Sequence, residues 1–429
     1  MTRNFIEELR ARNLLQAVTE GLEDILKDST QPLRGYIGFD PTAPSLTIGN
    51  FVQIATLRRF QLAGHQPIVL LGGATGRIGD PSGRDSERNL LDLETLERNI
   101  EHQRSQFAKF LDFSEDTPNR ALVVNNWDFY KDMNVLAFLR DVGKHITVNY
   151  MLAKDSVKNR MESGISFTEF SYQLIQGHDF EILHRQYDCP LQMGGGDQWG
   201  NITTGMEFIR KAGGKAHGLC TPLLTKADGK KFGKSDTGNL WLDPTMTTPY
   251  QFYQYWFSTN INDTDLPKLF RTLSFRSIEE IEALEQAHAG DAPTLRRLLA
   301  EELTELIHDK AALQQAQYAT QVVHNPRLSR EFIEGLTSEV WQTVGSEVGM
   351  YTIDKNDLAN IATLAAWLAD NKILPSLSEA RRAIQNSAIA INTEKIADTQ
   401  YKLSAADFLQ SGFMLLQNGK KNKYVVRLG

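Results

Sequence analysis

Four short apolar runs, each ending in glycine or polar residues, constrain the fold of this 429-residue chain most strongly. They are "YIGFD", "PIVLLGG", "ALVVNN" and "PLQMGGGDQ". The second run is continuously apolar and short, as expected of a strand buried on both faces of a sheet. Helical spacing over residues 51–63 separates the first two runs. Strands that alternate with helices predict a doubly wound, Rossmann-like α/β domain with a parallel sheet. Gly72, Gly73 and Gly76 lie where such sheets bind ligands, at the carboxyl end of a strand.

The rest of the chain divides into segments of different pattern. We expect the Rossmann-like domain over residues 1–225, with a mostly helical insertion at about 131–186. Helical spacing then predicts an all-α domain over 226–330. The periodicity weakens after residue 324, which indicates a linker at 331–350. Residues 351–429 combine two helices with the strand-like runs "AIAIN" and "YVVRL", and we expect a small α+β domain there.

Composition limits the partners of the chain. The formal net charge is −7, which argues against a protein that coats nucleic acid over its whole surface. The segment 372–429 nevertheless holds nine Lys and Arg against four acids, so this end alone is basic and suits a polyanion, although a solvated basic surface explains it equally well. No apolar run approaches a membrane span, and we expect no membrane partner. With only Cys189 and Cys220, neither a disulfide framework nor a cysteine zinc site is expected, and the default setting is cytoplasmic.

Two stretches carry residues suited to nucleotide chemistry. In "GFDPTAPSLTIGN", Thr47 and Asn50 are three residues apart and share a face if a helix begins there, while Gly49 leaves room for a flat base. Spacing alone favours helix packing as the reason for this glycine. In "KKFGKS", Lys231 and Lys234 bracket Gly233 in a loop, and two ammonium groups there could neutralise charge on a leaving group. An exposed lysine-rich turn explains that loop as well.

Together these stretches resemble the HIGH and KMSKS signatures of class I aminoacyl-tRNA synthetases. "GFDPTA", "GGATGRIGDPSG", "FTEFSYQLIQGHDF" and "GGGDQWGNITTG" further resemble the bacterial tyrosyl-tRNA synthetase family, over nearly the whole chain. The resemblance implies ATP-dependent attachment of L-tyrosine to its tRNA through a tyrosyl-adenylate. It implies ATP as a substrate, Mg²⁺ carried by the ATP phosphates with no dedicated protein metal site, and a homodimer with residues 138–152 and 164–170 near its interface.

The resemblance also assigns roles to individual residues. The tyrosine pocket would comprise Tyr36, Asp80, Tyr172, Gln176, Asp179 and Gln198. Tyr36 and Asp179 would bind the phenol, whereas Asp80, Tyr172 and Gln176 would bind the ammonium group. ATP would contact Asp40, Thr42, Gly49, Gly195, Asp197 and Lys234. The catalytic set would be Thr47, Asn50, Lys231, Lys234, Ser235, Arg84 and Arg88. In the C-terminal domain, which resembles a small RNA-binding fold, the residues on tRNA phosphates would be Arg381, Arg382, Lys420, Lys421 and Lys423.

Two positions depart from the family pattern. Asn50 stands for the second histidine of HIGH and offers an amide nitrogen in a similar place. Thr47 stands for the first histidine, and its hydroxyl is shorter and never cationic. We therefore expect Lys231, Lys234, Arg84 and Mg²⁺ to carry more of the γ-phosphate contact. At Gly196 the family more often has serine.

Three alternatives compete with this interpretation. A tryptophanyl-tRNA synthetase shares the domain plan, but an indole has no hydroxyl for Tyr36 and Asp179 to bind. A catalytically silent, RNA-binding paralogue is supported only by Thr47. Another nucleotidyltransferase of the superfamily would have no use for the helical and RNA-binding domains.

Overall fold

The computed structural model describes residues 4–29, 31–82, 90–161, 164–225, 232–235, 238–258 and 261–429. The chain forms two compact units. The first comprises residues 1–247 and 258–299, and the second comprises residues 248–257 and 300–429.

A six-stranded sheet with the order β1-β6-β5-β2-β3-β4 forms the centre of the first unit. Its strands are β1 (Ala17–Val18), β2 (Arg34–Phe39), β3 (Gln66–Leu71), β4 (Leu122–Asn125), β5 (Leu191–Gly195) and β6 (His217–Thr221). Strands β2 to β6 are parallel, and β1 pairs antiparallel with β6 at the edge. Every residue of β3 after Gln66 is buried, as its continuous apolar run predicts, and so is every residue of β5 and β6. The prediction of a doubly wound parallel sheet is confirmed.

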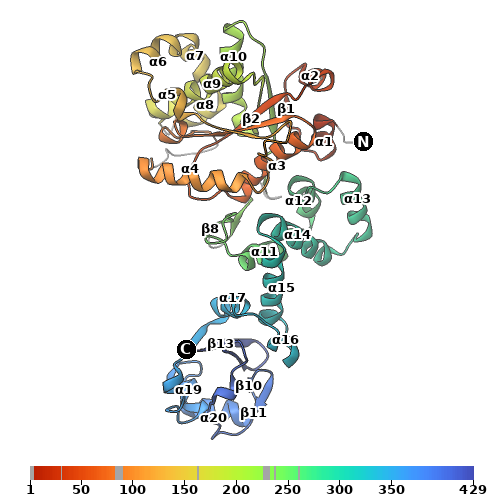
Figure 1. Ribbon diagram of the computed structural model, residues 1–429, viewed down its shortest axis with the longest axis vertical. Helices are drawn as coiled ribbons and strands as arrows, with labels where there is room; N and C mark the ends of the chain where they lie inside the picture. The colour runs from red at the N-terminus through yellow and green to blue at the C-terminus, as the bar shows by residue number, and fades with distance from the viewer. Residues whose placement is uncertain are drawn as a thin grey trace. The chain divides into compact units, whose positions relative to one another are not determined.

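Helices cover both faces of this sheet (Figure 1). Helices α3 (Ile48–Leu62) and α4 (Leu93–Phe107) connect β2, β3 and β4 in one direction, whereas α10 (Trp199–Lys211) connects β5 to β6 in the other. Right-handed crossovers in opposite directions place their helices on opposite faces. The strand order therefore reverses between β2 and β5, and the carboxyl ends of these two strands border the crevice where doubly wound sheets bind ligands.

The segment between β4 and β5 is helical, as expected for an insertion. It contains α5 (Trp127–Tyr130), α6 (Val135–Asp141), α7 (Val148–Leu152), α8 (Asp155–Met161) and α9 (Phe167–Tyr187). Arg160 and Glu169 form a doubly hydrogen-bonded ion pair at 2.9 Å, and both side chains are almost completely buried. Removal of either partner would leave an uncompensated buried charge, so this pair fixes α8 against the start of α9.

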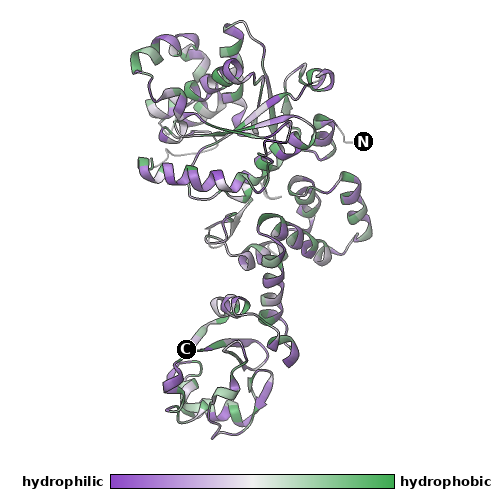
Figure 2. Ribbon diagram, viewed as in Figure 1, coloured by the Kyte–Doolittle hydropathy of each residue, from purple (hydrophilic) through white to green (hydrophobic). Residues whose placement is uncertain are grey.

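Hydrophobic residues are also prominent on α6 and α7, where they are exposed (Figure 2). The exposed fractions are 68% for Val135, 74% for Leu136 and 60% for Val148, and Phe167 at the start of α9 reaches 77%. Large apolar side chains that are this exposed and belong to one helical insertion suit a surface for association.

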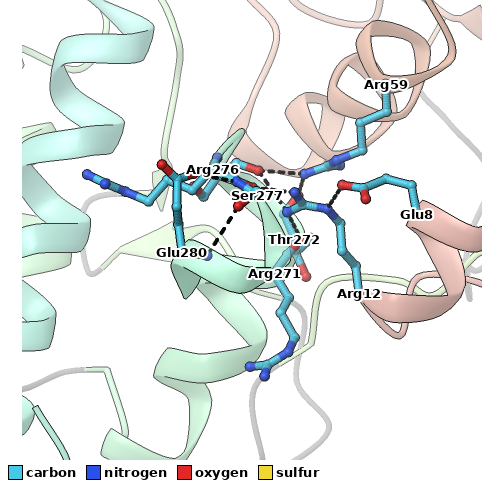
Figure 3. Close-up of polar contacts among 9 residues, drawn as sticks. Glu8, Arg12, Arg59, Arg271, Thr272, Arg276, Ser277 and Glu280 are labelled. Atoms are coloured by element: carbon cyan, nitrogen blue, oxygen red, sulfur yellow. Dashed lines mark hydrogen bonds and ion pairs between the residues drawn. The ribbon is translucent and has the colours of Figure 1, made fainter. Parts of the chain in front are cut away.

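Two buried arginines hold a helix of the 258–299 segment against the sheet domain (Figure 3). Arg59, near the end of α3, donates to the carbonyl oxygens of Thr272 at 2.9 Å and Ser274 at 2.8 Å. Arg12, which follows α1 (Phe5–Ala11), donates to the carbonyls of Arg271 and Ser274 at 3.2 Å each and also pairs with Glu8. These bonds satisfy carbonyls at the end of α12 (Leu266–Leu273) that have no partner within the helix. The unit is completed by α2 (Leu22–Asp28), α13 (Ile278–Ala287) and the first half of α14 (Ala292–Ile307).

The second unit joins helices to a five-stranded sheet with the order β11-β10-β12-β13-β9. Its strands are β9 (Met350–Ile353), β10 (Ile389–Ile391), β11 (Glu394–Ile396), β12 (Phe413–Asn418) and β13 (Asn422–Leu428). Its helices are α11 (Pro249–Phe257), the second half of α14, α15 (Lys310–His324), α16 (Arg330–Glu334), α17 (Ser338–Val348), α18 (Lys355–Leu358), α19 (Leu364–Asp370) and α20 (Leu377–Gln385). Met414, Leu416 and Val426 of the sheet pack with Leu368 and Ile384 in one core. None of the helices in the described ranges is long and apolar enough to cross a bilayer.

The structure differs from two of the expected segments, the linker at 331–350 and the all-α domain over 226–330. The stretch 331–350, predicted as a linker, is mostly helical, and Trp341 of α17 is fully buried and stacks on Phe413 of β12. The predicted helical domain 226–330 does not form a single body, because α12 packs on α3 whereas α11 packs on α15. Weak periodicity in "SEVWQTVGSEVG" concealed α17, whose buried residues are few and widely spaced.

Candidate active site

A pocket of about 260 Å³ opens at the carboxyl edge of β2, β3 and β5. Twelve of the residues that the sequence singled out line it together: Tyr36, Asp40, Thr42, Gly49, Asn50, Asp80, Tyr172, Gln176, Asp179, Gly195, Asp197 and Gln198. They come from separate parts of the chain between residues 36 and 198. The fold therefore gathers the residues predicted for tyrosine and those predicted for ATP at one site.

One end of the pocket holds Tyr36 and Asp179, and both are buried. Tyr36 lies in the middle of β2, where its ring packs edge-on against Phe180 at 5.4 Å. Its hydroxyl has no hydrogen-bond partner among the described residues. A buried hydroxyl without a partner is costly, so this one is suited to a group that enters from outside the chain.

Two donors that the sequence did not single out hold the Asp179 carboxylate. Asn126 donates from Nδ2 to Oδ2 at 2.9 Å, and Tyr130 donates from its hydroxyl to Oδ1 at 2.7 Å. Burial raises the pKa of Asp179 to about 7, although both hydrogen bonds oppose the shift. Burial likewise raises the pKa of Tyr36 well above its usual value, with the charge of Asp179 as a second cause. Asn126 follows the apolar run "ALVVN" and could have been predicted from its place after a strand, whereas nothing in the sequence marks Tyr130.

Carboxylates and amides line another part of the pocket. Gln198 donates to Oδ2 of Asp80 at 2.8 Å and accepts from Gln176 at 3.1 Å. Tyr172 donates to Oδ2 of Asp40 at 2.9 Å. The side-chain oxygens of Gln176 and of Gln192, a residue of β5 that the sequence did not single out, are buried without partners in the described part of the chain. Two carboxylates and several unpaired oxygens suit a cationic group.

Asp40 was predicted to contact ATP, but its carboxylate is bonded to Tyr172, a residue predicted to contact tyrosine. Its Oδ1 accepts from Thr75 at 2.7 Å, and its Oδ2 accepts from Tyr172. A Cβ atom on Gly72 would approach Asp40 Oδ1 to 2.2 Å, and one on Gly73 would approach Asn125 Oδ1 to 2.2 Å. The two glycines of "GGATG" are therefore needed because neighbouring side chains occupy the space of their missing Cβ atoms.

Thr47 and Asn50 form a reciprocal cap at the start of α3. The Thr47 hydroxyl donates to Asn50 Oδ1 at 2.8 Å, and the backbone N–H of Thr47 donates to the same oxygen at 2.9 Å. Thr47 is not among the residues that line the pocket, and its hydroxyl proton is used in the cap. Its role as a donor toward phosphate stays a prediction. The Nδ2 of Asn50, by contrast, has no acceptor among the described residues, and Asn50 lines the pocket. Gly49 beside it meets nothing closer than 3.5 Å at its Cβ position, which leaves that surface open.

The loop after β5 carries the ribose candidates Gly195 and Asp197. A Cβ on Gly195 would lie 2.8 Å from Asp197 Oδ1. At Gly196, where the family more often has serine, a Cβ would lie 2.2 Å from Oε1 of Gln16. The glycine is therefore explained by the neighbouring Gln16 side chain, which fills the position of a serine side chain.

Only part of the predicted cationic site belongs to the described residues. Arg84, Arg88 and Lys231 lie outside the described residues, and of Lys234 and Ser235 the structure gives the backbone of strand β7 (Lys234–Ser235). This strand pairs with β8 (Gly238–Asn239). Leu240 donates to the carbonyl of Gly233 at 2.8 Å and accepts from the N–H of Ile48 at 3.0 Å. The end of the lysine loop is thus tied to the first residue of α3, beside Gly49 and Asn50.

The predicted phosphate-binding residues of the C-terminal unit fall into two groups. Arg381 and Arg382 on α20 and Lys420 and Lys421 in the β12–β13 turn are exposed. Lys423 is buried, and its Nζ donates to the carbonyls of Val322 and Asn325 at 2.6 Å each and of Val323 at 3.3 Å. Its prediction as an RNA contact is wrong, because the ammonium group is committed to the carboxyl end of α15.

Comparisons with known proteins agree with this geometry. A family model described as class I tRNA synthetases (W and Y) matches residues 27–325, and a model of the tyrosine--tRNA ligase SYY-like C-terminal domain matches residues 339–426. The chain is 46% identical to a tyrosine--tRNA ligase of Porphyromonas gingivalis over 431 residues, covering 99% of both chains. It is also 46% identical to a tyrosine--tRNA ligase of Cytophaga hutchinsonii over 433 residues, with the same coverage of 99% of each. Among solved structures, a C-terminally truncated mitochondrial tyrosyl-tRNA synthetase of Coccidioides posadasii matches with a TM-score of 0.63 and 30% identity, over 73% of this chain and 91% of that one. The chain therefore belongs to the class I tRNA synthetases and, within them, to the tyrosine--tRNA ligase family.

Proposed function

We propose that this chain attaches L-tyrosine to its cognate tRNA in two steps. Tyrosine and ATP first form tyrosyl-adenylate with release of pyrophosphate, and the tyrosyl group then moves to the terminal ribose hydroxyl of the tRNA. The names of relatives that are 44–46% identical over the whole chain support this activity.

The observation that carries the proposal is the unpaired Tyr36 hydroxyl beside the Asp179 carboxylate. A phenol completes this arrangement, because it donates its proton to Asp179 and accepts one from Tyr36. Phenylalanine would enter the same space, leave the buried Tyr36 hydroxyl without a partner and bring no donor to the Asp179 carboxylate. A site that hydrogen-bonds a substrate hydroxyl rejects an analogue without that hydroxyl far more strongly than an apolar pocket rejects an analogue of slightly different size.

The amino acid's other end would lie among the carboxylates. Its ammonium group suits Asp80, Tyr172 and Gln176, with Gln198 holding Asp80 in place. Asp40 is a further candidate, because its carboxylate is bonded to Tyr172. The carboxylate of tyrosine would then face the nucleotide side.

On the nucleotide side, the reaction needs positioning more than acid or base. The attacking carboxylate is already ionised at neutral pH, so no general base is required. Hydrogen-bond donors directed at the phosphates would stabilise the charge that develops there in the transition state. Asn50 Nδ2 would be one such donor, the open surface of Gly49 would accept the base, and Thr42, Gly195 and Asp197 would hold the nucleoside.

The phosphates would be met by the cationic residues of two loops. These are Lys231 and Lys234 with Ser235, and Arg84 with Arg88. Mg²⁺ would enter with ATP as part of that substrate. Because the Thr47 hydroxyl is committed to Asn50, these cations and Mg²⁺ would carry the γ-phosphate contact.

The second step requires RNA beside a negatively charged chain. Arg381, Arg382, Lys420 and Lys421 are exposed in the C-terminal segment, which is basic although the chain as a whole has a net charge of −7. Contacts of this kind position RNA through its phosphates without reading bases. The exposed apolar residues of α6, α7 and the start of α9 would pair two copies of the chain into a homodimer. The cytoplasmic setting stays a prediction from cysteine content.

The alternatives account for less of this site. The indole of tryptophan has no oxygen that could accept from Tyr36, so that hydroxyl would stay unpaired. A silent RNA-binding paralogue was supported by Thr47 alone, and Thr47 has a structural role as a helix cap. Another nucleotidyltransferase would not need the C-terminal unit.

The deciding experiment is ATP–pyrophosphate exchange driven separately by tyrosine, phenylalanine and tryptophan. We expect kcat/KM for tyrosine to exceed that for phenylalanine and tryptophan by several orders of magnitude, and tyrosylation of tRNA to follow. Exchange that prefers tryptophan would replace the proposal with the tryptophanyl alternative. A folded chain that exchanges with none of the three would favour the silent paralogue.

A further inference from the structure

Tyr130 contacts Asp179 from a helix that sequence reasoning did not connect with the site. It ends the short helix α5, directly after β4, whereas Asp179 lies on α9. Its hydroxyl oxygen is 2.7 Å from Asp179 Oδ1 and 2.9 Å from the carbonyl oxygen of Ile175, one turn earlier on α9. Both neighbours are acceptors when Asp179 is ionised, yet the hydroxyl has a single proton.

The proton count links Tyr130 to the charge of Asp179. With Asp179 ionised, Tyr130 donates to the carboxylate, and each carboxylate oxygen has one fixed donor, Tyr130 on Oδ1 and Asn126 on Oδ2. With Asp179 protonated, the acid can donate to the Tyr130 oxygen while Tyr130 donates to Ile175. The same three atoms therefore accommodate either protonation state, and the Tyr130 hydroxyl favours the ionised state whenever it donates to Oδ1.

We propose that Tyr130 is a positioning residue for recognition of the substrate's phenol, because its hydroxyl keeps the Asp179 carboxylate ionised and aimed into the pocket. This inference rests on the proposed function, since it assigns a role in binding tyrosine. The ionised carboxylate accepts a hydrogen bond from the phenol more strongly than the neutral acid would, because its oxygens carry the charge. Tyr130 touches no substrate atom in this scheme and acts through Asp179.

Two ionisable groups around Asp179, His178 and Cys189, have pKa values that burial shifts away from neutral pH. The titratable and charged groups that face Asp179 or Tyr130 are Tyr36, Asp40, His178, Glu181 and Cys189. Burial lowers the pKa of His178 to about 4 and raises that of Cys189 to about 12. Asp40 and Glu181 are the remaining acids, and the Tyr130 hydroxyl bonds to neither. Burial raises the pKa of Asp179 itself to about 7.

The test is Tyr130→Phe, which removes one oxygen and keeps the ring. Loss of the donor raises the pKa of Asp179, so a larger fraction is protonated at pH 7. We expect the KM for tyrosine in pyrophosphate exchange to rise about fivefold at pH 7 and about tenfold at pH 6, corresponding to a shift of about one pH unit in its midpoint. The KM should approach the wild-type value by pH 9, while kcat and the KM for ATP stay within about twofold.

A control and a second substrate separate this role from simple packing. Tyr150→Phe removes a hydroxyl from the same helical insertion, where it bonds to the carbonyl of Thr203 at 3.2 Å, and should leave the pH profile unchanged. Phenylalanine has no phenol, so its weak kcat/KM should be unaffected in Tyr130→Phe, with an unfolding temperature close to wild type. A KM that rises equally at every pH and for both amino acids would overturn the inference and reduce Tyr130 to a packing residue. An unchanged tyrosine KM would overturn it too, whereas a wild-type chain without tyrosine-dependent exchange would overturn the proposed function beneath it.

Discussion

The hydroxyl of Thr47 donates to the side-chain oxygen of Asn50 at 2.8 Å, and the backbone of Thr47 donates to the same oxygen. Both bonds use Asn50 Oδ1, so the amide nitrogen is turned away from the cap. The two residues that replace the histidines of HIGH therefore divide their roles. Thr47 fixes the start of α3 and the rotamer of Asn50, and Asn50 presents its remaining donor to the pocket.

Asn50→Asp tests this division. Aspartate still accepts the cap hydrogen bonds at the start of α3, but it replaces the free N–H donor with an oxygen that repels phosphate. We expect kcat for pyrophosphate exchange to fall about 100-fold or more, as for other lost transition-state donors, with an unfolding temperature close to wild type. Thr47→Ala gives the opposite pattern and should cost about 1 kcal/mol of stability with a smaller loss of exchange. Equal losses of exchange in the two variants would contradict the division.

The sheet and most of the pocket could be predicted from sequence because both depend on local patterns. A continuous apolar run such as "PIVLLGG" has few alternatives to a buried strand, and the carboxyl ends of neighbouring parallel strands meet at one edge. Tyr130 and Gln16 could not be predicted, because each acts through a contact more than 40 residues away along the chain. Lys423 was misassigned for a related reason: its charge is visible in sequence, but the three carbonyls that bury it are not.

The buried Asp179 carboxylate should lower the free energy of unfolding, although the proposed binding of tyrosine requires it. The pKa of this carboxyl is about 7 in the folded chain and near 4 when unfolded, so between these values the folded state binds more protons than the unfolded state. The contribution of this group to stability therefore falls as pH rises from about 4 to 7. We expect Asp179→Asn to gain roughly a few kcal/mol of unfolding free energy above pH 7 and to lose that gain toward pH 4. Urea unfolding at pH 5 and pH 8 measures this, and tyrosine-dependent exchange should be lost throughout. A variant that is less stable than wild type at pH 8 would contradict the prediction.

Gly196 and Gln16 should behave as a coupled pair. Gly196→Ser places a side chain where Gln16 Oε1 would be 2.2 Å from the new Cβ, and we expect a cost of about 1–3 kcal/mol or a displaced loop with a raised KM for ATP. Gln16→Ala alone should be mild, and the double variant should recover most of the loss. Strictly additive effects in a double-mutant cycle would show that the two side chains do not compete for space.

Lys421 and Lys423 are two residues apart, but we expect the first to affect tRNA binding and the second to affect stability. Lys421 is exposed, so Lys421→Ala should weaken tRNA binding and reduce the dependence of log affinity on log salt by about one unit, with no loss of stability. Lys423→Ala should leave the carbonyls of Val322 and Asn325 unpaired and cost about 1–3 kcal/mol, seen as a lower unfolding temperature. A Lys423 variant that unfolds like wild type but binds tRNA poorly would restore the original prediction of an RNA contact.

The exposed apolar surface of α6 and α7 predicts that one substitution separates the subunits of a dimer. Leu136 is 74% exposed, so Leu136→Asp introduces a charge without removing a core side chain. Burial of two such charges at a symmetric interface is strongly unfavourable, and sedimentation at micromolar concentration should show a folded monomer. Leu62→Asp is the matched control, because Leu62 is 62% exposed at the end of α3, away from α6 and α7 in sequence, and should not change the sedimentation of the chain. If wild type and Leu136→Asp sediment alike as dimers, the pairing surface lies elsewhere. If wild type is itself a monomer, the exposed leucines and valines of α6 and α7 require another partner.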